Sequence, residues 1–145
     1  MPERFVRALD VFEAVLAGTP ADRWLSPSPC EGWAAVDVAG HVTAGLLVVE
    51  LRAAGRPLPE DDPDWHEVAG ADPLELLVHA WDLAQATGQS VVFDADLVGP
   101  ALATAREMAP GGREAGMLGP EVAVPGDAGD QARLLALFGR SPVGA

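Results

Sequence analysis

The chain contains no lysine, and its nine basic residues are arginines scattered along the sequence. Against them stand 22 acidic residues, so the formal net charge at pH 7 is −13. A surface with this charge repels phosphate backbones and anionic lipids. The composition therefore argues against nucleic acids and membrane surfaces as partners.

Cysteine is almost missing as well, since Cys30 is the only one. A single cysteine excludes an intrachain disulfide and is typical of a reducing compartment. Long apolar runs are also lacking, because the longest, residues 44–51, is interrupted by Glu50 and is far shorter than a membrane span. The first residues lead into an amphipathic stretch and not into an apolar signal sequence. These absences predict a cytoplasmic protein.

The residues that are present predict one all-α domain over residues 1–145. Hydrophobic residues make up 49% of the chain, and they recur at helical spacing between glycine- and proline-rich breaks. We expect an up-down bundle of four or five helices with a short extended piece near the C-terminus. The predicted helices cover residues 2–17, 34–54, 72–88, 94 or 96 to 108, and 127–138, and the extended piece covers residues 119–125.

Two connections in this bundle have a distinctive composition. Residues 23–33 contain prolines that favour an extended path, and we expect Trp24, Leu25 and Trp33 to hold this path against the core. Residues 55–71 form a linker with three prolines and an acidic run. His66 lies in this linker, where a surface position is expected.

The most informative pattern is the spacing of Glu75 and His79 on the predicted third helix. Side chains four residues apart lie on the same helix face, with Cβ atoms about 5–6 Å apart. A carboxylate and an imidazole placed in this way can bind one divalent cation. A third ligand is needed, and His41 in the second helix is the candidate. The result would be a site with two histidines and one carboxylate.

Each of these residues also has an explanation without a metal. With Asp72 as N-cap, Glu75 occupies the N3 position and could close a capping box. His79 and His41 could be core histidines whose ring nitrogens are satisfied by protein groups. Asp82, one turn after His79, could accept the second ring N–H of a metal-bound histidine or could lie on a solvated face.

Cys30 and the tryptophans leave further alternatives open. Cys30 precedes the second helix closely and would be a nucleophile if a helix N-terminus or a histidinium lowered its pKa; otherwise it is a buried, inert thiol. Asp82 and Cys30 are therefore the candidate catalytic residues. The four tryptophans either pack in the core and linker or line a cavity for an apolar ligand; they are Trp24, Trp33, Trp65 and Trp81.

Four parts of the chain together form a distinctive pattern: residues 28–33 (SPCEGW), His41, residues 75–88 (ELLVHAWDLAQATG) and residues 134–142 (LLALFGRSP). The most specific segment is Glu-x-x-x-His-x-Trp-Asp-Leu-Ala, followed later by Leu-Phe-Gly-Arg-x-Pro. This pattern resembles the DinB-like superfamily, and within it the metal-binding proteins related to the N-terminal domain of mycothiol-dependent maleylpyruvate isomerase.

The resemblance implies a helical bundle in which His41, Glu75 and His79 bind a divalent metal, zinc first and nickel second. It also implies an enzyme that uses the metal to activate a low-molecular-weight thiol such as mycothiol. Transferase, isomerase or hydrolase chemistry on a small molecule, including a role in secondary metabolism, fits this expectation. The alternative is a metal-free small-molecule-binding or cyclase-like protein that uses the cavity of the bundle.

The sequence departs from the family between the second and third helices. Family members carry a longer segment there, whereas this chain has only residues 55–71. A missing bundle helix would expose an apolar face. Either a second subunit covers that face, which predicts a homodimer, or the site is wider and takes a different substrate.

Overall fold

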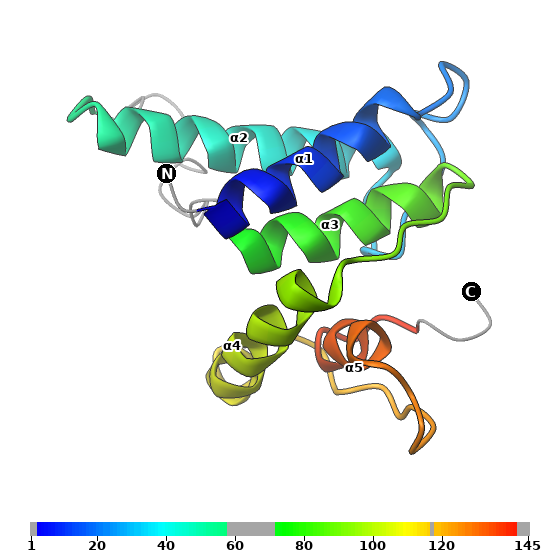
Figure 1. Ribbon diagram of the computed structural model, residues 1–145. Helices are drawn as coiled ribbons and strands as arrows, with labels where there is room; N and C mark the ends of the chain where they lie inside the picture. Colours follow the sequence, from blue (N-terminus) through cyan, green and yellow to red (C-terminus); the bar gives the residue numbers. More distant parts are fainter. Residues whose placement is uncertain (1–2, 58–71, 117, 142–145) are drawn as a thin grey trace. The chain divides into compact units, whose positions relative to one another are not determined.

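The computed structural model describes residues 3–57, 72–116 and 118–141, and these residues form five α-helices (Figure 1). The predicted all-α class is confirmed. Within the described residues there is no strand, only an isolated bridge between Pro27 and Ala34. The helices are α1 (Glu3–Ala17), α2 (Ala35–Ala53), α3 (Pro73–Ala86), α4 (Ala95–Glu114) and α5 (Asp130–Leu137).

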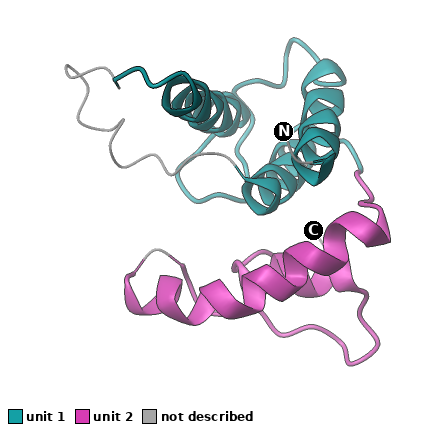
Figure 2. Ribbon diagram, turned by 60° about the vertical axis from the view of Figure 1, so that its left-hand side comes forward, with its two compact units in different colours: residues 1–90 teal, residues 91–145 magenta. Residues whose placement is uncertain are grey.

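The chain divides into two compact units, Met1–Ser90 and Val91–Ala145, which Figure 2 shows in different colours. The first unit contains α1, α2 and α3, and the second contains α4 and α5. A single domain over the whole chain stays a prediction.

In the first unit, α3 packs against both α1 and α2. Figure 1 shows α1 and α3 running in one direction and α2 running in the other. The apolar stripe of α1 is buried through Phe5, Ala8, Phe12 and Val15. Eleven of the fourteen residues of α3 are buried, so a polar side chain on this helix is surrounded by core.

The start of α3 follows its local sequence closely. Asp72 is the N-cap, and its carboxylate accepts a hydrogen bond of 2.8 Å from the Glu75 N–H. Pro73 follows at the first helical position, where its missing N–H costs no hydrogen bond. The helix ends at Ala86, and Gly88 then adopts φ +73°, a conformation that favours glycine. These signals fix the register of Glu75, His79 and Asp82 on the helix.

The connection before α2 is held by backbone hydrogen bonds. The Ala35 N–H donates to the Ser26 carbonyl (2.8 Å) and the Val36 N–H to the Trp24 carbonyl (2.9 Å). The sequence predicts that Leu25 holds this connection against the core, but its side chain is 84% exposed. That prediction is wrong, because the backbone bonds on either side of Leu25 fix the path without its side chain.

In the second unit, α4 packs against α5. The sequence predicts that this helix stops near Met108, but it continues through Pro110 to Glu114. Hydrogen bonds from Arg113 hold this extra turn, since its Nη2 donates to the Leu137 carbonyl at the end of α5 (2.6 Å) and its Nε to the Gly119 carbonyl in the loop after α4 (3.3 Å). Tertiary hydrogen bonds here outweigh the helix-breaking effect of proline.

The last helix begins later than the sequence indicates. The predicted start of α5 is residue 127, yet residues 125–128 form a turn in which the Ala128 N–H donates to the Pro125 carbonyl (3.0 Å). The Arg133 guanidinium stabilises this turn by donating to the carbonyls of Ala128 (3.0 Å) and Gly126 (2.7 Å). None of the helices in the described part of the chain has the length and apolar character needed to cross a membrane.

Candidate metal centre

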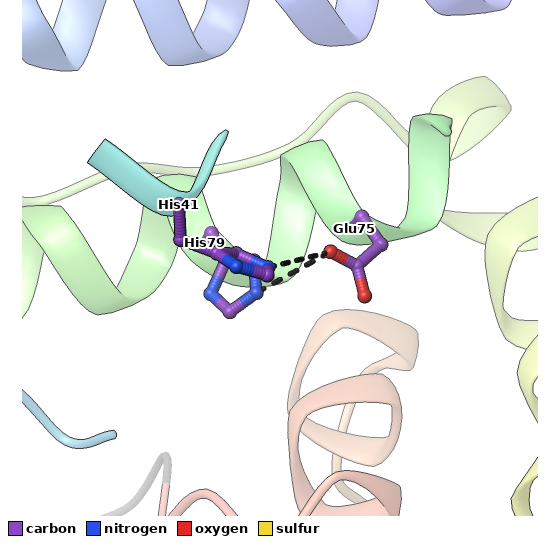
Figure 3. A group of neighbouring side chains, drawn as sticks. All are labelled: His41, Glu75 and His79. Carbon is purple, nitrogen blue, oxygen red and sulfur yellow. Dashed lines mark hydrogen bonds and ion pairs between the residues drawn. The ribbon is translucent and has the colours of Figure 1, made fainter. Parts of the chain in front are cut away.

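Three side chains from α2 and α3 converge at one point, as Figure 3 shows. Glu75 Oε2 lies 3.3 Å from His41 Nε2 and 3.5 Å from His79 Nε2. One ligand atom from each of the three residues lies within 4.8 Å of the other two. The structure thus brings together the three residues that the sequence proposed as metal ligands.

The two spacings that involve the Glu75 carboxylate fit a small divalent cation. In a tetrahedral zinc site with bonds of about 2.0–2.1 Å, neighbouring ligand atoms lie about 3.4 Å apart. The two distances from Glu75 Oε2, 3.3 and 3.5 Å, match this edge. Two imidazoles and one carboxylate also leave coordination positions for water or a substrate, as catalytic zinc sites require.

Asp82 determines which nitrogen of His79 faces the centre. The Asp82 side chain is 0% exposed, and its Oδ2 lies 3.0 Å from His79 Nδ1. A carboxylate can only accept a hydrogen bond, so Nδ1 carries the proton that it donates to Asp82. In the neutral ring the lone pair is then on Nε2, the atom that faces Glu75. The solvated-face interpretation of Asp82 is wrong, because its side chain is buried.

The capping-box interpretation of Glu75 describes only half of what the structure shows. Asp72 does accept from the Glu75 N–H at 2.8 Å. The Glu75 carboxylate, however, contacts His41 and His79. The backbone of Glu75 therefore serves the helix cap, and its side chain is available to the candidate metal centre.

Trp33 is a residue of this region whose place the sequence did not specify. Its ring centroid lies 5.0 Å from that of His41 and 6.3 Å from that of His79, with an interplanar angle of 27° to His79. The sequence leaves open whether this side chain packs in the core or lines a cavity. Its position shortly before His41, in the segment that carries the family resemblance, is the only signal that associates it with the site.

The sequence also singled out Cys30, His66 and Trp65 as residues of interest. Cys30 is half-buried in the turn before α2, where its N–H lies 3.2 Å from Ser28 Oγ. Among the described residues, the group of side chains able to hold a metal does not include it. His66 and Trp65 lie outside the described residues.

The carboxylates and imidazoles of the candidate metal centre stabilise one another's charged forms, and this shifts the pKa values of Glu75 and His79. Burial by itself would raise the pKa of Glu75, but hydrogen bonds and charge from His41 and His79 outweigh it and lower that pKa from 4.5 to about 2. Burial would likewise lower the pKa of His79, but the bonds and charges of Asp82 and Glu75 raise it from 6.5 to about 9. Without a metal, a proton on His79 balances the carboxylates.

We expect the stability of the metal-free protein to fall as pH rises from about 6.5 to 9. The raised pKa of His79 contributes stability that is fully present below 6.5 and is lost through about 9. The lowered pKa of Glu75 contributes stability that is present above 4.5 and is lost as pH falls toward 2. Unfolding in denaturant with a chelator present, at pH values of about 6, 7.5 and 9, measures the trend. A His79→Gln variant with the same decline would contradict it.

Two comparisons with known proteins give no match: no protein-family model matches the chain, and no solved structure does. Curated proteins of Mycobacterium tuberculosis do match. The uncharacterized protein Rv0738 is 34% identical over 137 residues, an alignment that covers 70% of this chain and 75% of the relative. The uncharacterized protein Rv0036c is 30% identical over 122 residues, covering 68% of this chain and 48% of the relative.

The first alignment also shows a difference in length. It runs over 137 positions but includes only 70% of the 145 residues of this chain. The relative therefore carries residues inside the aligned stretch that have no counterpart here. With its identity and its coverage of both proteins, this alignment shows that the chain belongs to the protein family that includes Rv0738.

Proposed function

We propose that this protein is a metal-dependent enzyme of the DinB-like type that acts on a small molecule. The observation that carries the proposal is the convergence of His41 Nε2, His79 Nε2 and Glu75 Oε2 around one point, with His79 oriented by a buried carboxylate. Catalytic zinc sites use the same set of two histidines and one glutamate. Zinc is the first candidate for the metal and nickel the second.

The donor set supports a catalytic site more than a structural one. Structural zinc sites are closed by four protein ligands, whereas catalytic sites use three and keep a position open. The described residues offer three. When bound, the metal would supply Lewis acidity and lower the pKa of a coordinated water or thiol. A coordinated water would support hydrolase chemistry. A coordinated thiol, with mycothiol as one candidate, would support transferase or isomerase chemistry.

The residues of the candidate metal centre differ in burial, and we assign them different roles on that basis. His79 and Asp82 are sealed in the core, with side chains 10% and 0% exposed. This pair would hold one ligand in a fixed orientation. His41 and Glu75 are 27% and 38% exposed, and they would complete the site on the side that a small molecule can reach.

The first test is metal analysis of protein purified without added metal. We expect about one divalent ion per chain in the wild type and far less in His79→Ala, because the variant loses one of three ligands. His66→Ala is the matched control, since His66 is the remaining histidine of the sequence. It should retain the metal.

The contrary result would be equally informative. A wild-type protein that contains no metal, and takes up neither zinc nor nickel when these are supplied, would contradict the proposal. In that case stabilisation by aromatic ligands alone would favour the metal-free binding protein instead.

A further inference from the structure

The indole of Trp33 borders the candidate metal centre, although it supplies no ligand. Its centroid is 5.0 Å from that of His41 and 6.3 Å from that of His79, and the two imidazole centroids are themselves 5.0 Å apart. The three rings therefore form one cluster. In this cluster the indole is in direct contact with both imidazoles that would bind the metal.

The residues around the centre differ in exposure. His79 and Asp82 form the sealed side of the centre, whereas His41 and Glu75 are 27% and 38% exposed. Trp33 is nearer to His41 than to His79, and it is itself half-buried. The indole is thus nearer to the more exposed of the two histidine ligands.

The backbone holds Trp33 in place. Its N–H donates to the Cys30 carbonyl (3.0 Å) and its carbonyl accepts from the Ser28 N–H (2.9 Å). Gly32, just before it, has φ +81°, which a residue with a side chain would rarely adopt. A surface that is already ordered loses little conformational entropy when a ligand binds to it.

We infer that the small molecule bound at this centre carries a flat unsaturated group, aromatic or conjugated, next to the oxygen or sulfur atom that binds the metal. The flat group stacks on the indole of Trp33, which makes Trp33 a specificity-determining residue. The oxygen or sulfur atom of the small molecule accounts for its binding to the metal. The indole accounts for the preference among small molecules that carry the same metal-binding atom. This inference rests on the proposed function, because it requires a metal at the centre.

The test compares two ligands with the same metal-binding group and rings of similar size. Benzohydroxamate carries a flat aromatic ring and cyclohexanecarbohydroxamate a puckered saturated one. Calorimetric titration into the zinc-loaded wild type should give about fivefold tighter binding of the aromatic compound, which corresponds to about 1 kcal/mol, because aromatic pairs attract each other beyond the area they bury. Trp33→Leu should bind both compounds equally well.

Two further variants serve as comparisons for Trp33→Leu. Trp33→Phe should retain part of the preference, since it keeps a smaller aromatic ring. Trp24→Leu, a change of another half-buried tryptophan in the same connection, should retain all of it. Equal binding of the two compounds by the wild type, or an undiminished preference in Trp33→Leu, would overturn the inference.

The zinc affinity of every variant is measured first, so that the two proposals are tested separately. If the wild type binds no zinc, the proposed function fails and the inference fails with it. If it binds zinc without preferring the aromatic compound, only the inference fails. Should Trp33→Leu lose its zinc, Trp33→Phe decides, and an unchanged preference in that variant would contradict a role for the indole.

Discussion

Zinc at about 1,000 times its dissociation constant is expected to stabilise the wild-type protein by about 4 kcal/mol, and Glu75→Gln is expected to lose nearly all of this gain. A ligand that binds only the folded state stabilises it by RT ln(1 + c/Kd), where c is the free ligand concentration, so the gain grows with the logarithm of that concentration relative to the dissociation constant. The substituted amide has nearly the shape of the native carboxylate but lacks its charge. If the change weakens binding about 1,000-fold, the gain falls below about 0.5 kcal/mol. Chemical denaturation with and without zinc measures both values.

Glu50→Gln is the control for this prediction. Glu50 is an exposed residue near the end of α2, away from the converging side chains, and the change is chemically the same. It should show the full zinc effect. Equal stabilisation of Glu75→Gln and the wild type would mean that zinc binds elsewhere, and the assignment of Glu75 as a ligand would be wrong.

Replacing Asp82 is expected to have the second large effect, on stability and on metal affinity together. Asp82→Ala removes the acceptor 3.0 Å from His79 Nδ1 and leaves that N–H unsatisfied in the core. An unsatisfied buried donor costs about 1–3 kcal/mol of unfolding free energy. The ring of His79 also loses its orientation, and removal of such a partner typically weakens metal binding about 10- to 100-fold.

Thr87→Val separates these two effects. Thr87 is another buried polar residue, at the end of α3, and its Oγ1 donates to the Leu83 carbonyl (2.8 Å). The valine variant should be destabilised but should bind zinc as the wild type does. If Asp82→Ala and Thr87→Val weaken zinc binding equally, the effect of Asp82 is one of general stability, and its role in orienting His79 is disproved.

The candidate ligands could be predicted because their signals are local. Asp72 and Pro73 mark the start of α3, and the helical repeat then places Glu75 and His79 on one face whatever surrounds them. Asp82 follows one turn later by the same repeat. The chain has three histidines, so His41 was one of few possible partners. The predicted homodimer and the thiol, by contrast, stay predictions.

Predictions from the local sequence were wrong where distant residues or the backbone determine the structure. Pro110 is a strong stop signal, but the hydrogen bonds from Arg113 to the chain around α5 keep α4 helical beyond it. Leu25 is apolar, but the backbone bonds of its neighbours leave its side chain exposed. In both cases the stabilising hydrogen bonds are made by residues distant in the sequence or by the backbone. Such bonds cannot be predicted from the local amino-acid composition.

The sequence by itself determined the all-helical class and the register of Glu75 and His79 on α3, because helix periodicity and capping act over a few residues. His41 became the third candidate ligand because the chain has few histidines and through the resemblance to the DinB-like superfamily. Only the tertiary structure decided that His41 meets Glu75 and His79, that Asp82 is buried against His79, and that Trp33 borders the centre. These facts depend on how α2 and its preceding turn pack against α3. Packing of this kind is set by the combined contacts of many side chains.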